Sequence, residues 1–158
     1  MDCRLEVVIL DVSDVDASLK FYTERIGFRL DVDYQPTSDF RVVQLTPPGS
    51  ACSIQFGIGI SDVPRGGPHV NYLVVHDLDG ACRELAERGV RVRDVRHKSP
   101  VEAWEGGWAP GVDPNHRDYA SFADFSDPDG NVWVLQELGH HSDAAASTLD
   151  RGADQGRV

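Results

Sequence analysis

Two stretches of the chain share one pattern of apolar and polar positions, with Val70 standing where Val7 stands in the first copy. Each stretch begins with an apolar run rich in β-branched residues, at 7–12 and 70–75, and such runs favour strands. Asp14 and Asp77 follow these runs, and an aspartate there accepts hydrogen bonds from the free amides of a first helical turn. The pattern therefore predicts a strand followed by a helix, twice.

Apolar residues after each aspartate recur at the i, i+4 and i+7 spacing of a buried helix face. They are Val15, Leu19 and Tyr22 in the first copy and Leu78, Cys82 and Leu85 in the second. Gly27 and Gly89 stand where these helices should end, since glycine adopts the left-handed C-terminal conformation at little cost.

A second repeat covers residues 40–56 and 121–137. Each segment is an apolar strand, a turn rich in Pro and Gly and another strand, which predicts a hairpin. Aligning the two turn glycines, Gly49 and Gly130, also places Gln55 over Gln136. This offset is larger than that of the first repeat, so the second copy contains an insertion.

The insertion lies within residues 97–118, which contain three Pro and three Gly and show no clean period. We therefore predict a long loop there. Trp104 and Trp108 favour an ordered loop, because large aromatic side chains are costly to leave in water.

Chain length and composition indicate one domain, since 158 residues at 41% hydrophobic content are enough for one core. We place this domain at 1–138, with a first unit at about 4–60, a second at about 68–138 and the inserted loop at 97–118. Residues 139–158 lack an apolar face, so we expect a flexible tail in which His140 and His141 have no metal-binding role.

Charge and cysteine content narrow the range of partners. The formal net charge of −11 opposes binding to nucleic acid or anionic lipid, and no apolar run is long enough to cross a membrane. Cys3, Cys52 and Cys82 are an odd number without a CxxC pair, and no signal-peptide pattern precedes them. We expect a cytoplasmic protein with reduced thiols and neither nucleic acid nor membrane as a partner.

The motif DPDGN at 127–131, the motif VSD at 12–14 and the tandem repeat together resemble the vicinal oxygen chelate superfamily. That family includes glyoxalase I, extradiol dioxygenases, fosfomycin-inactivating enzymes and bleomycin-resistance proteins, and the resemblance covers about residues 5–138. It implies an α+β, glyoxalase-like fold, in which two tandem βαβββ modules form curled mixed sheets around a cavity. It also implies a homodimer.

Most enzymes of this family hold a divalent metal with His and Glu on the first and last strands of the modules. Counted from the two motifs, the ligand positions fall on Val7, Val70 and Val134, and the repeat offset places the fourth on Ser53. Three valines and a serine supply neither the charge nor the lone pairs that such a metal needs. His69 is one residue away from a ligand position, and strand alternation turns its side chain to the opposite face. We therefore predict no metal and no cofactor.

The remaining cavity lining is predicted from strand alternation, and it is apolar with a few hydrogen-bonding groups, as in sites for small organic molecules. Its predicted members are Val7, Ile9, Ser53, Gln55, Val70, Tyr72, Val74, Val134 and Gln136. Gln55 and Gln136 either face each other across the cavity or lie exposed at strand ends. Tyr72 either donates a hydrogen bond or an acidic proton, or serves only in packing. Glu137 has the opposite parity to Val134 and is expected to meet water or the partner subunit.

The end of the inserted loop leads into the strand before DPDGN, which should bring His116, Arg117, Asp118 and Tyr119 near the cavity mouth. A histidine there suits a general base, and an arginine suits a carboxylate or phenolate. The alternative is a polar rim in which Arg117 pairs with Asp113 or Asp118.

Trp104 and Trp108 fit either a lid that stacks on a flat ligand or packing of the loop on its own domain. The acidic chain also fits a cationic, planar ligand, although the sequence does not localise its charge.

These residues leave two main functions open. One is a protein that sequesters a small organic molecule, as the bleomycin-resistance branch does. The other is a metal-free tailoring enzyme of the lyase, isomerase or cyclase type, with His116, Tyr72 or Asp118 as acid or base. A metal-dependent lyase or dioxygenase with non-standard ligands is a further alternative. An acid and a base within hydrogen-bond reach of each other favour the enzyme, whereas aromatic walls without such a pair favour the binding protein.

Overall fold

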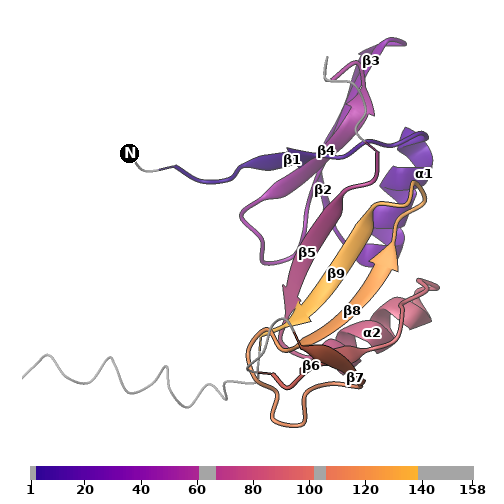
Figure 1. The fold of residues 1–158 in the computed structure, drawn as a ribbon. Helices are drawn as coiled ribbons and strands as arrows, with labels where there is room; N and C mark the ends of the chain where they lie inside the picture. The colour runs from indigo at the N-terminus through magenta and orange to yellow at the C-terminus, as the bar shows by residue number, and fades with distance from the viewer. Residues whose placement is uncertain (1–2, 61–66, 102–105, 139–158) are drawn as a thin grey trace, which may run out of the picture.

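The computed structural model describes residues 3–60, 67–101 and 106–138, which form two mixed β-sheets with their helices on one side (Figure 1). The first half contains β1 (Val7–Ile9), α1 (Val15–Lys20), the π-helical turn η1 (Phe21–Ile26), β2 (Arg29–Thr37), β3 (Phe40–Thr46) and β4 (Ser53–Ile58). The second half contains β5 (Val70–Val75), α2 (Leu78–Glu87), β6 (Arg96–Ser99), β7 (Gly107–Pro110), β8 (Ser121–Ser126) and β9 (Val132–Glu137).

The two sheets repeat one topology, with strand orders β1-β4-β3-β2 and β5-β9-β8-β6-β7. In each sheet the first strand runs parallel to the last strand of its half, β1 to β4 and β5 to β9, and the other pairs are antiparallel. This arrangement confirms the predicted α+β fold with two mixed sheets. None of the described helices has the length and apolar composition needed to span a bilayer.

The inserted segment contains a hairpin, so the prediction of a long loop over 97–118 is wrong for part of it. Strand β7 pairs antiparallel with β6, with Trp108 opposite Lys98, and β6 continues the sheet beside β8. Sequence patterning missed β6 because its residues, RHKS, are polar and show no apolar alternation, although β6 lies inside the sheet between β8 and the edge strand β7. Trp104 and the tail at 139–158 lie outside the described residues.

The helices begin and end at the predicted residues. The side chain of Asp14 accepts from Ala17 N at 2.9 Å, and that of Asp77 accepts from Gly80 N at 2.8 Å. Gly27 and Gly89 have φ angles of 83° and 77°, in the left-handed region that ends each helix.

The two helix ends also hold the modules together by a reciprocal contact. Arg25 Nη1 donates to the carbonyl oxygens of Arg88 and Gly89 at 3.1 and 3.0 Å. A Cβ at Gly89 would lie 2.5 Å from Arg25 Nη1, and a Cβ at Gly27 would lie 2.7 Å from Arg88 Nη1. Each glycine therefore leaves room for the arginine of the other module.

The core lies between the helices and the sheets, and Tyr22 is at its centre with no exposed surface. Its hydroxyl donates to Asp127 Oδ2 at 2.6 Å and accepts from Trp133 Nε1 at 3.0 Å. Burial, together with the Asp127 carboxylate, raises the pKa of Tyr22 above its usual range, so the hydroxyl remains a donor. Asp127 also accepts from the backbone amides of Asp129 and Asn131. The DPDGN turn is thus fastened to the helix of the first module.

The three cysteines are free. Burial raises the pKa of Cys82 to about 11, with Asp79 and Asp77 adding to the shift, so this thiol stays protonated near neutral pH.

Replacing Tyr22 by Phe tests the buried hydroxyl. Tyr22→Phe leaves Trp133 Nε1 without its acceptor and removes a donor from Asp127, so we expect a loss of about 1–3 kcal/mol in the free energy of unfolding. Urea denaturation measures this value. Tyr34→Phe removes an exposed hydroxyl and should change it by less than about 0.5 kcal/mol. Equal urea midpoints for the two variants would contradict the role of Tyr22.

Candidate functional site

Each sheet has one face covered by helices and one face left open. On β5, Leu73 and Val75 pack against the core, whereas Val70, Tyr72 and Val74 are 62%, 61% and 52% exposed. On β4, Ile54 and Phe56 are buried in the core, which places Ser53 and Gln55 on the other side. We call the two uncovered sides the open faces. By strand alternation, the side chains of β1, β4, β5 and β9 that were predicted to line a cavity lie on these open faces.

Strand register corrects one equivalence between the modules. Gln55 pairs with Ile9 in the first module, and Val134 pairs with Tyr72 in the second. Since Ile9 and Tyr72 are equivalent in the first repeat, the position equivalent to Val134 is Gln55 and not Ser53. The two turn glycines are not equivalent in space, so aligning them displaced the next strand by two residues. Side chains two residues apart on a strand lie on the same face of the sheet. The residues predicted to line the cavity are therefore unchanged by this correction.

With this register, the four positions that the resemblance assigns to metal ligands are Val7, Gln55, Val70 and Val134. The valines have no lone pairs, and the Gln55 amide donates through Nε2 to Gln44 Oε1 at 2.7 Å. No group of three or more His, Cys, Asp or Glu side chains lies close enough to hold a metal among residues 3–60, 67–101 and 106–138. This donor set does not fit the divalent metal that the family implies.

A row of polar side chains crosses the open face of the first sheet. Gln55 donates to Gln44, whose Nε2 donates to Ser53 Oγ at 3.4 Å. Ser53 Oγ lies 2.7 Å from Thr46 Oγ1, and Thr46 in turn donates to Asp31. The Thr46 hydroxyl, with Arg29, lowers the pKa of Asp31 and keeps it an acceptor. The row fixes the orientation of both amides, and it leaves Gln55 Oε1 to accept from a ligand.

The open face of the second sheet carries an ion pair and an aromatic group, which we call the Trp108 cluster. Its members are Arg96, Lys98, Trp108, Phe122 and Asp124. Asp124 pairs with Val134 across β8 and β9, is 7% exposed and contacts Arg96 through both oxygens at 2.9 and 3.1 Å.

The aromatic part of the cluster is built on Trp108. Its ring meets Phe122 edge to face at 5.2 Å, with Arg96 and Lys98 at 4.9 and 4.0 Å from the ring centre. The cluster therefore presents an indole in contact with two cationic side chains.

The sequence missed four members of this cluster. Arg96 and Lys98 lie on the strand that the pattern did not reveal, and Asp124 sits in an apolar strand where a lone carboxylate carries no signal of its partner. Trp108 was a candidate, and its place on the open face is compatible with the predicted ligand contact.

His116 turns toward the helix-covered side. Its Nδ1 lies 3.2 Å from both oxygens of Glu137, which is 1% exposed and also accepts from Leu78 N at the start of α2. The expectation that Glu137 meets water or a partner is therefore wrong, because the first turn of α2 and the 113–119 loop close over it. Val134 has the opposite parity and faces the open side.

The other loop candidates bond mostly within the second module. Arg117 pairs with Asp113 at 2.8 and 2.9 Å, as in the alternative of a polar rim, and this pair holds the pKa of Asp113 well below its usual range. Gln136 Nε2 donates to the carbonyl of Tyr119 at 3.1 Å, so Gln136 and Gln55 have separate partners. Asp118 is exposed.

Comparisons with known proteins agree with this fold. The family model "Glyoxalase/Bleomycin resistance protein/Dioxygenase superfamily" matches residues 4–135. The crystal structure of TnmS3, an antibiotic binding protein from Streptomyces sp. CB03234, is 31% identical, with 87% of this chain and 97% of that chain covered and a TM-score of 0.62. A glyoxalase/bleomycin resistance protein from the same strain is 30% identical, with 85% and 100% covered and a TM-score of 0.60. A superfamily member from Sphaerobacter thermophilus is 26% identical, with 86% and 98% covered and a TM-score of 0.63.

Replacing Asp113 by Asn tests the ion pair that holds the 113–119 loop. The folded-state pKa of Asp113 lies below the unfolded value, so its contribution is fully present above about pH 4 and is lost as the pH falls further. We expect Asp113→Asn to lower the free energy of unfolding by about 1–3 kcal/mol at pH 7, and by less at pH 3. Urea denaturation at a series of pH values measures both.

The exposed carboxyl of Asp39 provides the control, and Asp39→Asn should change the free energy of unfolding by less than about 0.5 kcal/mol at either pH. A difference between wild type and Asp113→Asn that stays constant from pH 7 to pH 3 would show that the carboxylate charge is not what stabilises the loop.

Proposed function

Because the chain belongs to the Glyoxalase/Bleomycin resistance protein/Dioxygenase superfamily, we propose that it binds a small aromatic, antibiotic-like molecule on its open faces, without a metal. The observation that carries this proposal is the row of exposed apolar side chains on β5, beside family ligand positions that hold valines. Hydrocarbon at those positions replaces metal chemistry with an apolar contact surface.

The exposed row has a free-energy cost that a ligand or partner removes. Burying apolar surface yields about 25 cal/mol per Å², so covering Val70, Tyr72 and Val74 together stabilises a complex by several kcal/mol. A soluble monomer seldom leaves such a continuous patch in water without a binding role.

The polar groups on the open faces suit orientation of a bound molecule. Gln55 Oε1 accepts at a fixed place on the first sheet, while the exposed Trp108, packed on the buried Phe122, supplies a flat surface on the second. A mainly apolar site with a few oriented polar groups is typical of organic-ligand sites. TnmS3, an antibiotic binding protein, is 31% identical over nearly its whole length, which supports this class of ligand.

Binding is favoured over catalysis by the arrangement of acids and bases. The Asp124 carboxylate is neutralised by Arg96, and His116 is engaged with Glu137 on the helix-covered side. The second candidate, a metal-free lyase, isomerase or cyclase, would have to use Tyr72 or Asp118 as its acid. A metal-dependent lyase or dioxygenase would need ligands other than Val7, Gln55, Val70 and Val134.

We further propose that the protein acts as a homodimer in the cytoplasm, with the open faces of the two copies closing the cavity. The exposure of Val70, Tyr72 and Val74 in the single chain supports this assembly, because a second copy would remove these side chains from water.

Ligand binding is tested with Nile red, an uncharged aromatic dye whose fluorescence rises in apolar sites, and with bleomycin as a competitor. We expect saturable Nile red binding that Tyr72→Ala and Trp108→Ala each weaken about tenfold, since each substitution removes an aromatic contact. Ile58→Ala shortens a similarly exposed apolar side chain on the helix side of β4 and should leave binding unchanged.

The same titration tests the metal. Binding should be equal before and after dialysis against EDTA, and elemental analysis of untagged protein should find substoichiometric Mn, Fe, Ni and Zn. Loss of binding after EDTA, or equal binding by all three variants, would overturn the proposal.

Assembly is tested by sedimentation equilibrium. The wild-type mass should be about twice the 17.4 kDa of one chain, and Val70→Asp should reduce it to one chain by placing a charge in the buried contact. Ile58→Asp places the same charge outside the open faces and should remain dimeric. A monomeric wild type, or a dimeric Val70→Asp, would rule out this assembly.

A further inference from the structure

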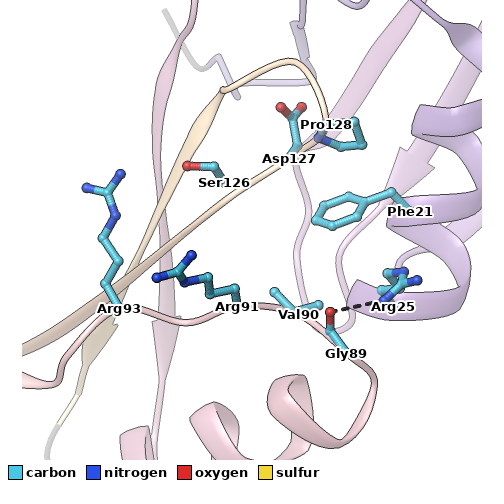
Figure 2. A pocket seen from close by; sticks show the side chains of 9 residues that line it. All are labelled: Phe21, Arg25, Gly89, Val90, Arg91, Arg93, Ser126, Asp127 and Pro128. Carbon is cyan, nitrogen blue, oxygen red and sulfur yellow. Dashed lines mark hydrogen bonds between the residues drawn. The ribbon is translucent and has the colours of Figure 1, made fainter.

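A cavity of about 580 Å³ lies where η1 meets the residues after α2 and the turn after β8 (Figure 2). Phe21, Val90 and Pro128 form its apolar walls, and Arg25, Arg91 and Arg93 bring three guanidinium groups to it. We propose that this cavity is a second binding site, for an organic oxyanion with a phosphate or carboxylate group on an aromatic body. This site is separate from the proposed ligand site on the open faces.

The side chains that line this cavity carry a net positive charge, whereas the whole chain is acidic. The protein has a formal net charge of −11, yet among the described residues that line this cavity Asp127 is the only acidic one. Its carboxylate points away from the arginines in Figure 2 and accepts from Tyr22 Oη at 2.6 Å and Asn131 Nδ2 at 2.8 Å. On its buried side the Asp127 carboxylate is thus held by neutral hydrogen-bond donors, and among the described residues no carboxylate pairs with Arg91 or Arg93.

The backbone segment that carries Arg91 and Arg93 is fixed against the core and orients both side chains. The two residues alternate with Val90 and Val92, which pack on the core, so both arginines rise on one side (Figure 2). Arg93 N donates to Asp124 O at 2.7 Å, which fixes the segment against β8.

Their guanidinium groups are available to a ligand. Within the described part of the chain, neither group makes a hydrogen bond or ion pair, whereas Arg41, Arg96 and Arg117 each pair with a carboxylate. Two guanidinium forks on one side of a segment match the oxygens of a phosphate or carboxylate.

The remaining walls indicate the body of the ligand. Phe21 is half-buried, and its ring packs on Tyr22 and Phe125. Because Phe21 also lines the cavity, it offers an aromatic surface beside the arginines. Arg25 is fixed by its bonds to Arg88 and Gly89 and closes the far side. A volume of about 580 Å³ suits a mid-sized organic molecule rather than a bare ion.

The test is a titration of ¹⁵N-labelled protein with phenyl phosphate, followed through the arginine Nε–Hε signals, with inorganic phosphate and benzoate in parallel. We expect saturable shifts of the Arg91 and Arg93 signals, with phenyl phosphate binding about tenfold more tightly than inorganic phosphate because its ring covers Phe21 and Val90. The benzoate arm decides whether a carboxylate serves as well as a phosphate.

The matched control separates a built site from general attraction. Arg91→Ala/Arg93→Ala should weaken phenyl phosphate binding at least about tenfold, with the remaining readout on Arg25. Arg4→Ala/Arg83→Ala removes the same charge from exposed arginines elsewhere and should leave it unchanged. Equal weakening in both double variants, or equal affinity for phenyl phosphate and inorganic phosphate, would overturn the proposal. Nile red binding should be the same in both double variants. A negative result for the oxyanion site is therefore distinct from a negative result for ligand binding on the open faces.

Discussion

The Tyr22 hydroxyl is the interaction on which the relation between the two modules depends. It lies in the core between a carboxylate and an indole N–H of the other module, and both bonds are made far from water. Around it, Asp129 accepts from Ser13 N at 2.8 Å, and Asn131 Nδ2 donates to Asp11 O at 3.2 Å. The DPDGN turn thus serves the structure by binding the first module, and it leaves the ligand chemistry to other residues.

Placing both helices on one side has a direct consequence for the other side. Alternation along β5 packs the partly buried Leu73 and Val75 against the core and exposes Val70, Tyr72 and Val74. The apolar character of the open faces is therefore not explained by the core of the single chain, which is complete without them. The proposed ligand and the proposed second copy would cover this apolar surface together, because the second copy would close the space around the ligand.

The sequence predicted most of the fold and less of the site, for physical reasons that differ between residues. Helix caps and C-terminal glycines depend on a residue's immediate neighbours. The sequence therefore predicted the N-caps Asp14 and Asp77 and the helix-ending Gly27 and Gly89. The β6–β7 hairpin could not be predicted, because neither Arg96–Ser99 nor Gly107–Pro110 shows the apolar alternation by which a strand is recognised. Gln55 was aligned with Gln136, whereas strand register makes it equivalent to Val134. The alignment failed because two turns that share a glycine can differ in length, and turn length sets the register of the next strand. Glu137 was misplaced since its burial depends on a loop and a helix start that meet only in the folded chain.

The duplicated modules have diverged most on the faces they leave open. The first sheet carries a neutral row of amides and hydroxyls that ends on Asp31, whereas the second carries an indole in contact with two cationic side chains and an ion pair at Asp124. Part of this difference lies in the backbone, because Trp108 is on β7, a strand that has no counterpart in the four-stranded first sheet. If the open face of one copy meets the other module of its partner, the amide row stands opposite the indole. A flat ligand between them would then be stacked on one side and hydrogen-bonded at its rim on the other. This asymmetry gives a reason for retaining two modules that share most of their topology and carry different chemistry.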